Sequence, residues 1–425
     1  MKNSYLLSVC HGVLLSLAIV SSGGAETLDD AWKIGLETNH LLKAATENTF
    51  ASQAELDAAK GGRLPTLNIG AGYSILDNNP VSMAGDVQFA TADAQSLSYK
   101  AMVSLPLYTH FQLSSLIDSA TANLAASRFS EQSARQKVKL QIAQAYVSVL
   151  LRSKQTEVAT SQEQSLAAHA ADVQNLHDEG MVPVNDLLAA KVALANARQV
   201  QLQVENQLDI AKAAYNRLLN RALDYKVDLQ AIHPSFPEVD LDTVSEDALI
   251  SRPELAALSE QINALQLQAE AAKTASGPKV FLTSGYDYRE NSYQLHEGVW
   301  QATVMASWDI FDGNVAKNKG LAIQARSRSV AEQRRDLETL VLLQVRQAWL
   351  DMEESRKRIE VTRKTLAQAE ENLEVTRNRY KEGMGTNTEV LDAESLRTVN
   401  YVSYDRANND AVLAVLRLRY AIGKL

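Results

Sequence analysis

The sequence has one cysteine in 425 residues, Cys10, and it lies in an N-terminal segment with Lys2 as its only charge. An apolar run follows Lys2, and the segment ends in two glycines and Ala25. This pattern predicts a signal peptide over residues 1–25, with the mature chain beginning at Glu26. Lipidation of Cys10 is the alternative, but the bulky Val9 before it favours ordinary cleavage. The mature protein then has no thiol, which excludes disulfide and thiolate chemistry.

Beyond the leader, the sequence lacks any apolar run near the roughly 18 residues that a membrane-spanning helix needs. If the chain crosses a membrane, it therefore does so with strands. It also lacks an excess of basic residues. The net charge is −9 at pH 7, and loss of Lys2 makes it more negative by one unit, which argues against nucleic acid as a partner.

The residue groups that enzymes use are also missing. No nucleophile-and-base pair, phosphate-binding loop or ligand cluster occurs in the sequence, so we expect no enzyme, no cofactor and no metal site. His169 and His177 are eight residues apart on one helix face, about 12 Å along it, too far to share a metal ion. We predict that these two are solvated surface residues, and also the scattered His40, His110, His233 and His296.

What the sequence does have is an internal repeat. The segment EGMV at 179–182 recurs as EGMG at 382–385, an offset of 203 residues that holds from Ser104 to about Asn220. Upstream the offset is 213, and the ten-residue difference falls between Tyr73 and Ser104. Packed elements do not tolerate such length changes, so a surface loop is expected at about 77–95. The two repeats are residues 26–240 and 241–425.

Four windows alternate with period two and predict strands, at about 65–75, 97–108, 278–289 and 299–311. Two soluble hairpins packed on helices are one interpretation. Lipid contact is favoured because the windows have about the length of a tilted membrane strand, and because their apolar faces carry interfacial aromatics. These aromatics are Tyr73, Tyr99, Tyr286, Tyr288, Trp300 and Trp308.

Four strands cannot close a barrel, and open edges are not tolerated in lipid. Two copies of the chain would give eight strands, whose interior is filled by side chains, whereas three copies give twelve and leave a lumen. The sequence therefore predicts a homotrimer as the smallest assembly with a pore.

Each strand pair is followed by a helical hairpin, at about 112–220 and 314–423. Residues 112–178 contain neither proline nor glycine and predict a helix of about 100 Å. The corresponding helix of the second repeat has a seven-residue apolar rhythm, from Val345 and Met352 to Tyr380, which requires a partner helix. Return helices at 183–220 and 387–423 cover half of each long helix, and shorter segments at 28–60 and 241–274 cover the other half.

With this pattern the chain resembles the TolC family of outer-membrane efflux proteins over its mature length. The segments that carry the resemblance are EGMVPVNDLLAA at 179–190, RPELAAL at 252–258 and YKEGMGTNTEVLDA at 380–393. The resemblance implies a mainly α fold with a small membrane β-barrel portion, in which a trimer forms a twelve-strand barrel and a twelve-helix periplasmic tunnel. It also implies a place in the outer membrane of a Gram-negative bacterium, with a periplasmic adaptor (membrane fusion protein) and an inner-membrane pump as partners.

By the same resemblance, four residues fall on positions that the family uses at the periplasmic gate: Asp186, Tyr380, Glu389 and Asp392. The hairpin tips expected to dock the adaptor comprise Gly180, Met181, Val182 and Pro183, and Gly383, Met384, Gly385 and Thr386. Gly385 stands where the best-known member has an arginine, so the gate is expected to have fewer polar links.

Three of the four gate residues also have a simpler interpretation, whereas Asp392, one turn deeper, has no capping role to explain it. Thr386 and Glu389 form a capping-box pattern, and Asp186 lies in the first turn of a helix, so both carboxylates could stabilise helix starts. Tyr380 could be plain packing, and Gly180 and Gly383 are expected to end helices. Two alternatives to the channel remain: a periplasmic coiled-coil adaptor and a structural coiled-coil protein. Cargo is not specified by the sequence.

Overall fold

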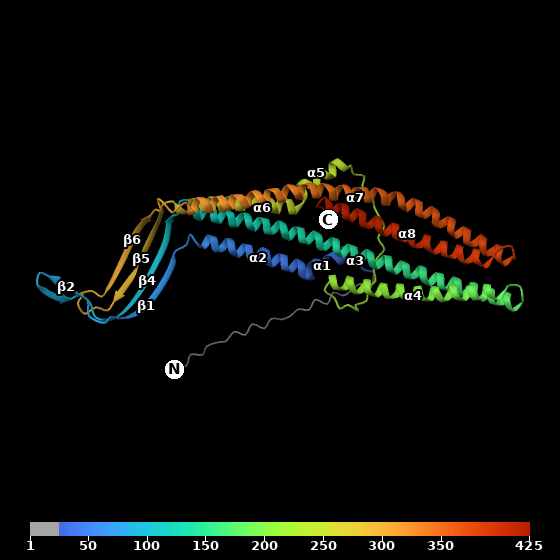
Figure 1. The fold of residues 1–425 in the computed structure, drawn as a ribbon, viewed down its shortest axis with the longest axis horizontal. Helices are drawn as coiled ribbons and strands as arrows, with labels where there is room; N and C mark the ends of the chain where they lie inside the picture. The colour runs from blue at the N-terminus through green and yellow to red at the C-terminus, as the bar shows by residue number, and fades with distance from the viewer. Residues whose placement is uncertain (1–24) are drawn as a thin grey trace, which may run out of the picture.

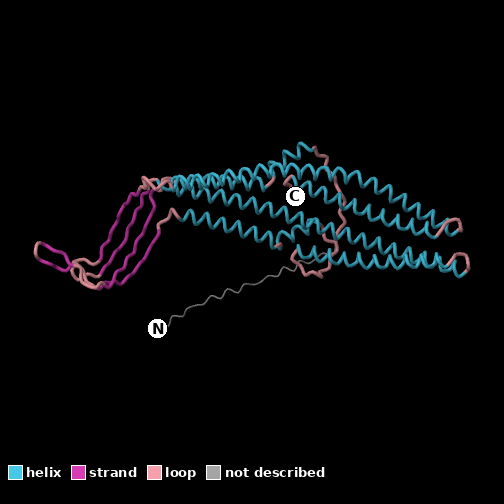
Figure 2. Tube along the Cα trace, viewed as in Figure 1, coloured by secondary structure: helices cyan, strands magenta, loops and turns pink. Residues whose placement is uncertain are grey.

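The computed structural model describes residues 25–425, so the predicted signal peptide, apart from Ala25, lies outside the described residues. The molecule is elongated, with strands at one end, helical hairpins at the other, and the C-terminus near the middle (Figures 1 and 2). This shape follows from the repeat, because each half places its strands and hairpin in the same order.

The first repeat contains these elements: α1 (Leu28–Thr38), α2 (His40–Gly61), β1 (Thr66–Ile75), β2 (Val81–Ala84), β3 (Val87–Ala90), β4 (Gln95–Tyr108), α3 (Gln112–Asp178) and α4 (Val184–Leu218). The second contains α5 (Leu241–Ser251), α6 (Pro253–Lys273), the 3-10 turn η1 (Thr274–Ser276), β5 (Lys279–Arg289), β6 (Gly298–Ser307), α7 (Val315–Lys381) and α8 (Asn387–Ala421).

Two local features differ from the sequence expectation. The short helical segments are each broken in two, at Asn39 and at Arg252, where the backbone is extended. Asn39 caps α2 by accepting hydrogen bonds from the backbone amides of Leu41 and Leu42, and Pro253 disfavours helical geometry at Arg252. The expected surface loop at 77–95 also contains the hairpin of β2 and β3, which turns at Gly85 with a positive φ of 62°.

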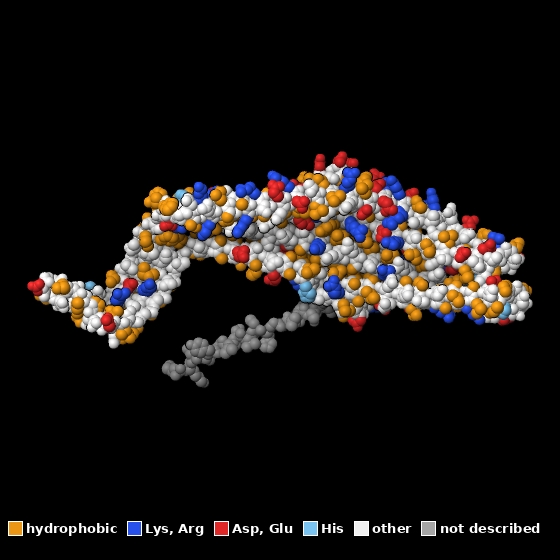
Figure 3. Space-filling view, viewed as in Figure 1, with side chains coloured by type: hydrophobic (Ala, Val, Ile, Leu, Met, Phe, Trp, Pro, Cys, Tyr) orange, Lys and Arg blue, Asp and Glu red, His pale blue; other side chains and the backbone are white. Residues whose placement is uncertain are grey.

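The four long strands form one antiparallel sheet in the order β1-β4-β5-β6, which leaves β1 and β6 as open edges. The register brings the apolar side chains together on one face. Leu67 lies opposite Val103, the rings of Tyr99 and Tyr288 stack at 4.4 Å, and Tyr286 lies opposite Trp300. The other face is more polar, and there Lys100 lies opposite Asp287. On the side shown in Figure 3, charged side chains are sparse over the middle of the strands.

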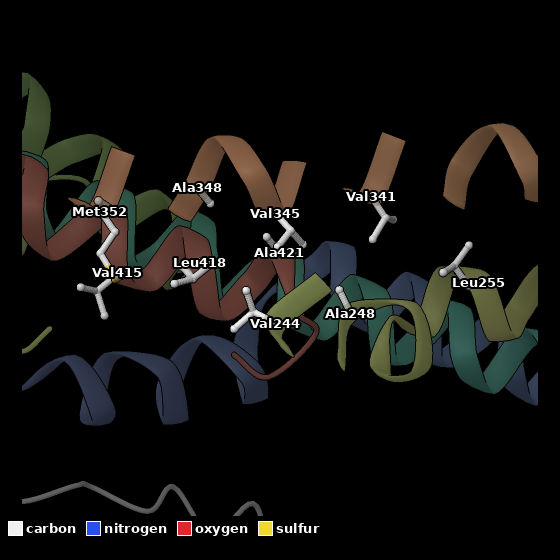
Figure 4. Close-up of a cluster of buried hydrophobic side chains, with 11 residues drawn as sticks. Val244, Ala248, Leu255, Val341, Val345, Ala348, Met352, Val415, Leu418 and Ala421 are labelled. Atoms are coloured by element: carbon white, nitrogen blue, oxygen red, sulfur yellow. The ribbon is translucent and has the colours of Figure 1, made fainter. Parts of the chain in front are cut away.

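The helices pack as two antiparallel hairpins, α3 with α4 and α7 with α8, while α2 lies along α3 and α6 lies between α3 and α7. The largest core lies where α5 and α6 meet α7 and α8, and it includes Val244, Val345, Met352 and Leu418 (Figure 4). Small residues such as Ala348 and Ala421 let the helix backbones approach closely there. Across residues 25–425, no helix is both long enough and apolar enough to cross a membrane.

Candidate functional site at the hairpin tips

The tips of both hairpins lie together at the end of the molecule that is opposite the strands (Figure 1). Just beyond the last residue of each long helix lies a glycine with positive φ, 75° at Gly180 and 70° at Gly383. The next residue donates its backbone N–H to a carbonyl in the last helical turn, as in a Schellman motif. The expectation that both glycines end helices is confirmed. Met181 and Met384 follow them and are 68% and 66% exposed.

At the start of α8 the capping box is present. The Thr386 hydroxyl accepts from the Glu389 amide, and the Glu389 carboxylate accepts from the Thr386 amide at 3.1 Å. Glu389 therefore stabilises the start of α8, whether or not it also acts at a gate. At the start of α4, Pro183 holds the cap position and its side chain caps nothing, while Asp186 lies half-buried in the first turn. Asp392 is exposed, with no hydrogen bond or ion pair within the described residues.

The two hairpins are joined at Asn387, the first residue of α8. Asn387 is 1% exposed. Its Oδ1 lies 2.7 Å from Nε2 of His169 on α3, and its Nδ2 donates to the backbone oxygen of Asp186 on α4 at 3.1 Å. One amide therefore contacts both helices of the first hairpin.

His169 corrects a sequence prediction. The sequence predicts a surface position for it, but it is 6% exposed, because its face of α3 meets the second hairpin. Its ring lies 5.4 Å from the ring of Tyr380. Burial lowers the pKa of His169 below its ordinary value; the bond to Asn387 opposes this, and the charge of Arg377 adds to it.

Tyr380 lies in the same contact region between the two hairpins, which we call the joint and which includes His169, Asp186 and Asn387. Tyr380 is 7% exposed. It packs on Val173, Leu187 and Val390, which come from α3, α4 and α8. Within the part of the chain that the structure describes, its hydroxyl has no hydrogen-bond partner. Burial raises the pKa of Tyr380, and the nearby Asp186 carboxylate raises it further. Packing is therefore the role that the contacts of Tyr380 support.

Farther along α8 from the tip, a buried carboxylate that was not among the predicted site residues links the hairpins a second time. The Glu394 side chain, on α8, is 2% exposed. It accepts from Arg397 at 2.6 Å, from Arg377 of α7 at 3.1 Å and from the Ser165 hydroxyl of α3 at 3.0 Å. Arg377 also donates to Ser165. A signal was available, since Glu394 lies four residues after the buried Val390, on the same helix face.

The structure thus divides the four expected gate residues into two pairs. Asp186 and Tyr380 lie at the joint between the hairpins, whereas Glu389 and Asp392 lie on the exposed surface of α8. Among residues 25–425 no group of three or more His, Cys, Asp or Glu side chains could hold a metal ion.

The sequence model of a protein family described as outer membrane efflux protein matches residues 34–221 and 244–424. The chain is similar to the alkaline protease secretion protein AprF of Pseudomonas aeruginosa, with 24% identity over 413 residues that cover 93% of this chain and 84% of AprF. It is also similar to the outer membrane protein TolC of Vibrio cholerae, with 24% identity over 419 residues, 94% of this chain and 91% of TolC.

Solved structures share the fold. A crystal structure of CusC has a TM-score of 0.81 at 19% identity and covers 93% of this chain and 92% of CusC. The outer membrane protein VceC of Vibrio cholerae has a TM-score of 0.80 at 17% identity, with 93% and 96% covered. The MtrE channel of Neisseria gonorrhoeae, described in an open state, has a TM-score of 0.76 at 19% identity, with 93% and 88% covered.

Proposed function

The chain belongs to the outer membrane efflux protein family, and on that premise we propose how its parts serve an outer-membrane channel of a tripartite efflux or type I secretion system. The observation that carries the proposal is the division of the subunit into two ends. A membrane-type sheet with two open edges lies at one end, and two joined helical hairpins lie at the other. Substrate passes along the axis between these ends, without chemical change, from the periplasm or a pump to the exterior.

The open sheet edges support a trimer. Strand direction alternates across the sheet from β1 to β6, so β1 and β6 point in opposite directions. β6 of one copy can therefore pair with β1 of the next as another antiparallel pair. Three copies then close a barrel of about twelve strands, with a lumen. In that barrel the face with Tyr99, Tyr286 and Trp300 contacts lipid, and the face with Lys100 and Asp287 lines the pore.

The hairpin end serves as the periplasmic gate. Glu389 and Asp392 are exposed on α8, so their carboxylates can line an opening between copies. Asp186 and Tyr380 hold the two hairpins of one copy together, through the Asp186 carbonyl and the packing of the Tyr380 ring. That the MtrE neighbour is described in an open state supports a gate in this fold.

The tips beyond the gate serve as the docking surface for a periplasmic adaptor that connects to an inner-membrane pump. Met181 and Met384 support this assignment, because exposed methionines adapt readily to a partner surface. The flanking residues of each tip are Gly180, Val182 and Pro183, and Gly383, Gly385 and Thr386.

The cargo of this channel is set by its pump rather than by its own residues. The names of the relatives support this, since AprF is a protease secretion protein and CusC of Escherichia coli is a cation efflux system protein. Identification of the inner-membrane pump that purifies with the chain tests it directly. Cargo transport that does not change when that pump is exchanged for one of another class would contradict it.

Two measurements test the channel and the gate. The expressed protein is expected in the outer-membrane fraction, and purely soluble periplasmic material would instead favour an adaptor or structural coiled coil. For the gate, the double variant Glu389→Gln with Asp392→Asn removes two charges and keeps the cap, since glutamine also completes a capping box. We expect altered conductance and weaker cation preference in planar bilayers, with Asp224→Asn in the exposed linker as the control. Unchanged conductance and cation preference would leave only the capping role.

A further inference from the structure

We propose that His169 makes the joint between the two hairpins sensitive to acid, so that a proton on its ring loosens the contact of α8 with α3 and α4. The inference rests on the proposed function, because it assigns a regulation to the gate at the hairpin end. His169 is a positioning residue here, since it acts through Asn387 rather than on the substrate.

The hydrogen bonds of Asn387 fix the protonation state of the ring. Its Nδ2 donates to the Asp186 carbonyl, so its Oδ1 is the acceptor that faces His169. Nε2 of His169 must therefore carry a hydrogen, and in the neutral ring Nδ1 has none. A second proton adds at Nδ1 and places a charge in a joint where the ring is 6% exposed.

The charged groups around the ring come from every helix of the joint. From α7 come Arg377 and Lys381, which line a cavity of about 150 Å³ beside the ring, together with the neutral Tyr380. From α8 comes Glu394, which Arg377 and Arg397 already neutralise. From α3 itself comes Asp172, and α4 contributes the carbonyl of Asp186 and, farther away, its carboxylate near Tyr380. The balance of burial and Arg377 against Asp172, Glu394 and Asn387 keeps the pKa of His169 below its ordinary value.

The sign of the pH effect follows from this direction. In the joined state the ring resists protonation, whereas a ring released to water titrates near about pH 6.5. Below that pH the separated state binds more protons, so acid shifts the equilibrium toward separation. For each unit by which the joint lowers the pKa of His169, acid can shift the equilibrium between joined and separated hairpins by up to tenfold. The full shift is reached once the pH is below the pKa of His169 in the joined state. At neutral pH and above the joint is at its firmest.

The counterpart of His169 in the second repeat, at the offset of 203, is Asn372, and the counterpart of Glu394 in the first is the exposed Lys191. The repeat therefore does not duplicate the polar links of the joint. Each copy of the chain has one His169, and a proton on it changes the charge there.

Planar-bilayer recording of the reconstituted protein tests the proposal. Acidification of the periplasmic side from about pH 7.5 to about pH 5.5 is expected to raise the open probability several-fold, with a midpoint below about pH 6.5. His169→Gln keeps a neutral N–H donor for Asn387 and cannot titrate, so it is expected to stay at the level of neutral pH. The matched control is His177→Gln, eight residues along the same helix, where the response is expected to persist. A rise that survives in His169→Gln, or no rise in the unaltered protein, overturns the proposal.

A labelling experiment keeps the test independent of the histidine variant. The mature chain is expected to lack cysteine, so Val390→Cys reports on the joint and Met384→Cys reports on the exposed tip; Val390 is 1% exposed. The ratio of their maleimide labelling rates cancels the effect of pH on the thiol itself. We expect this ratio to rise several-fold at about pH 5.5, and a constant ratio overturns the acid response. Conductance absent from every variant, with the labelling response intact, would instead refute the channel assignment and leave the joint's acid response standing.

Discussion

Removal of the buried charge of Glu394 is expected to loosen the second hairpin. Glu394→Gln keeps the size of the side chain but leaves Arg377 and Arg397 without their shared carboxylate. Unit charges about 4 Å apart attract by about 4 kcal/mol at an effective dielectric constant near 20, and removal of one partner of a buried pair costs about 3–5 kcal/mol. Because the side chains of Arg377 and Arg397 are 34% and 18% exposed, water recovers part of this.

We therefore expect a loss near the lower limit, about 3 kcal/mol, which is roughly a 150-fold change in the equilibrium for local opening. Hydrogen exchange of the backbone amides at 390–400 in the purified protein measures it directly. The matched control is Glu374→Gln, an exposed carboxylate of α7 with no ion pair within the described residues, which is expected to leave this protection unchanged.

Two results would refute this reasoning. One is a fall in protection of less than about threefold, since that would mean that the carboxylate contributes little to the joint. The other concerns the triple replacement of Glu394, Arg377 and Arg397 by methionine. If unpaired charge is the cause, an apolar set of similar size is expected to restore most of the protection. A triple variant as weak as Glu394→Gln would point to a different cause.

Three further predictions concern other parts of the subunit. Arg252→Met removes a guanidinium that donates to the Ala421 carbonyl and pairs with Glu254. We expect the free energy of unfolding to fall by about 2–3 kcal/mol, seen as a lower thermal midpoint in circular dichroism. An unchanged midpoint would refute this prediction. Glu26→Gln removes the ion pair between Arg221 and Glu26, whose side chains lie 2.8 Å apart. Faster proteolysis of the linker at 220–240 is expected, and cleavage rates equal to those of the unaltered chain would contradict this. Gly383→Ala forces a side chain to a φ of 70° and is expected to cost about 1–2 kcal/mol in hydrogen-exchange protection at the tip, whereas Gly61→Ala, with open space around it, is expected to be harmless.

Much of the fold could be predicted because the sequence states it twice. The period-two alternation predicts the four long strands, the seven-residue rhythm predicts α7, and the offset of 203 residues aligns the hairpins of the two halves. The prediction of a mainly α fold with a small strand portion is confirmed. The break at Arg252 has a visible signal in Pro253, which disfavours a continuous helix there. The hairpin of β2 and β3 is short, and its composition resembles that of a loop.

The joint between the hairpins could not be predicted to the same degree. Periodicity shows that one face of α3 is buried, but not that His169 on that face meets Asn387 from another hairpin. In the same way Glu394 resembles a surface residue until Arg377 and Ser165 are placed around it. The contacts of His169 with Asn387 and of Ser165 with Glu394 join segments more than 200 residues apart. Local pattern can indicate which helix face is buried, as it does for Glu394, but not which partner a polar residue meets there. Polar residues at the joint therefore resemble surface residues in the sequence.

Single-channel recording of the purified mature chain in planar bilayers is the most direct test of whether the chain forms a channel. We expect discrete conductance steps of uniform size, because the proposed trimer closes one pore through the open edges β1 and β6. We also expect larger or more frequent openings in Glu394→Gln, where the joint between the hairpins is weakened. Protein that inserts into the bilayer but gives no steps, in the unaltered chain and in Glu394→Gln alike, would contradict the proposed channel function.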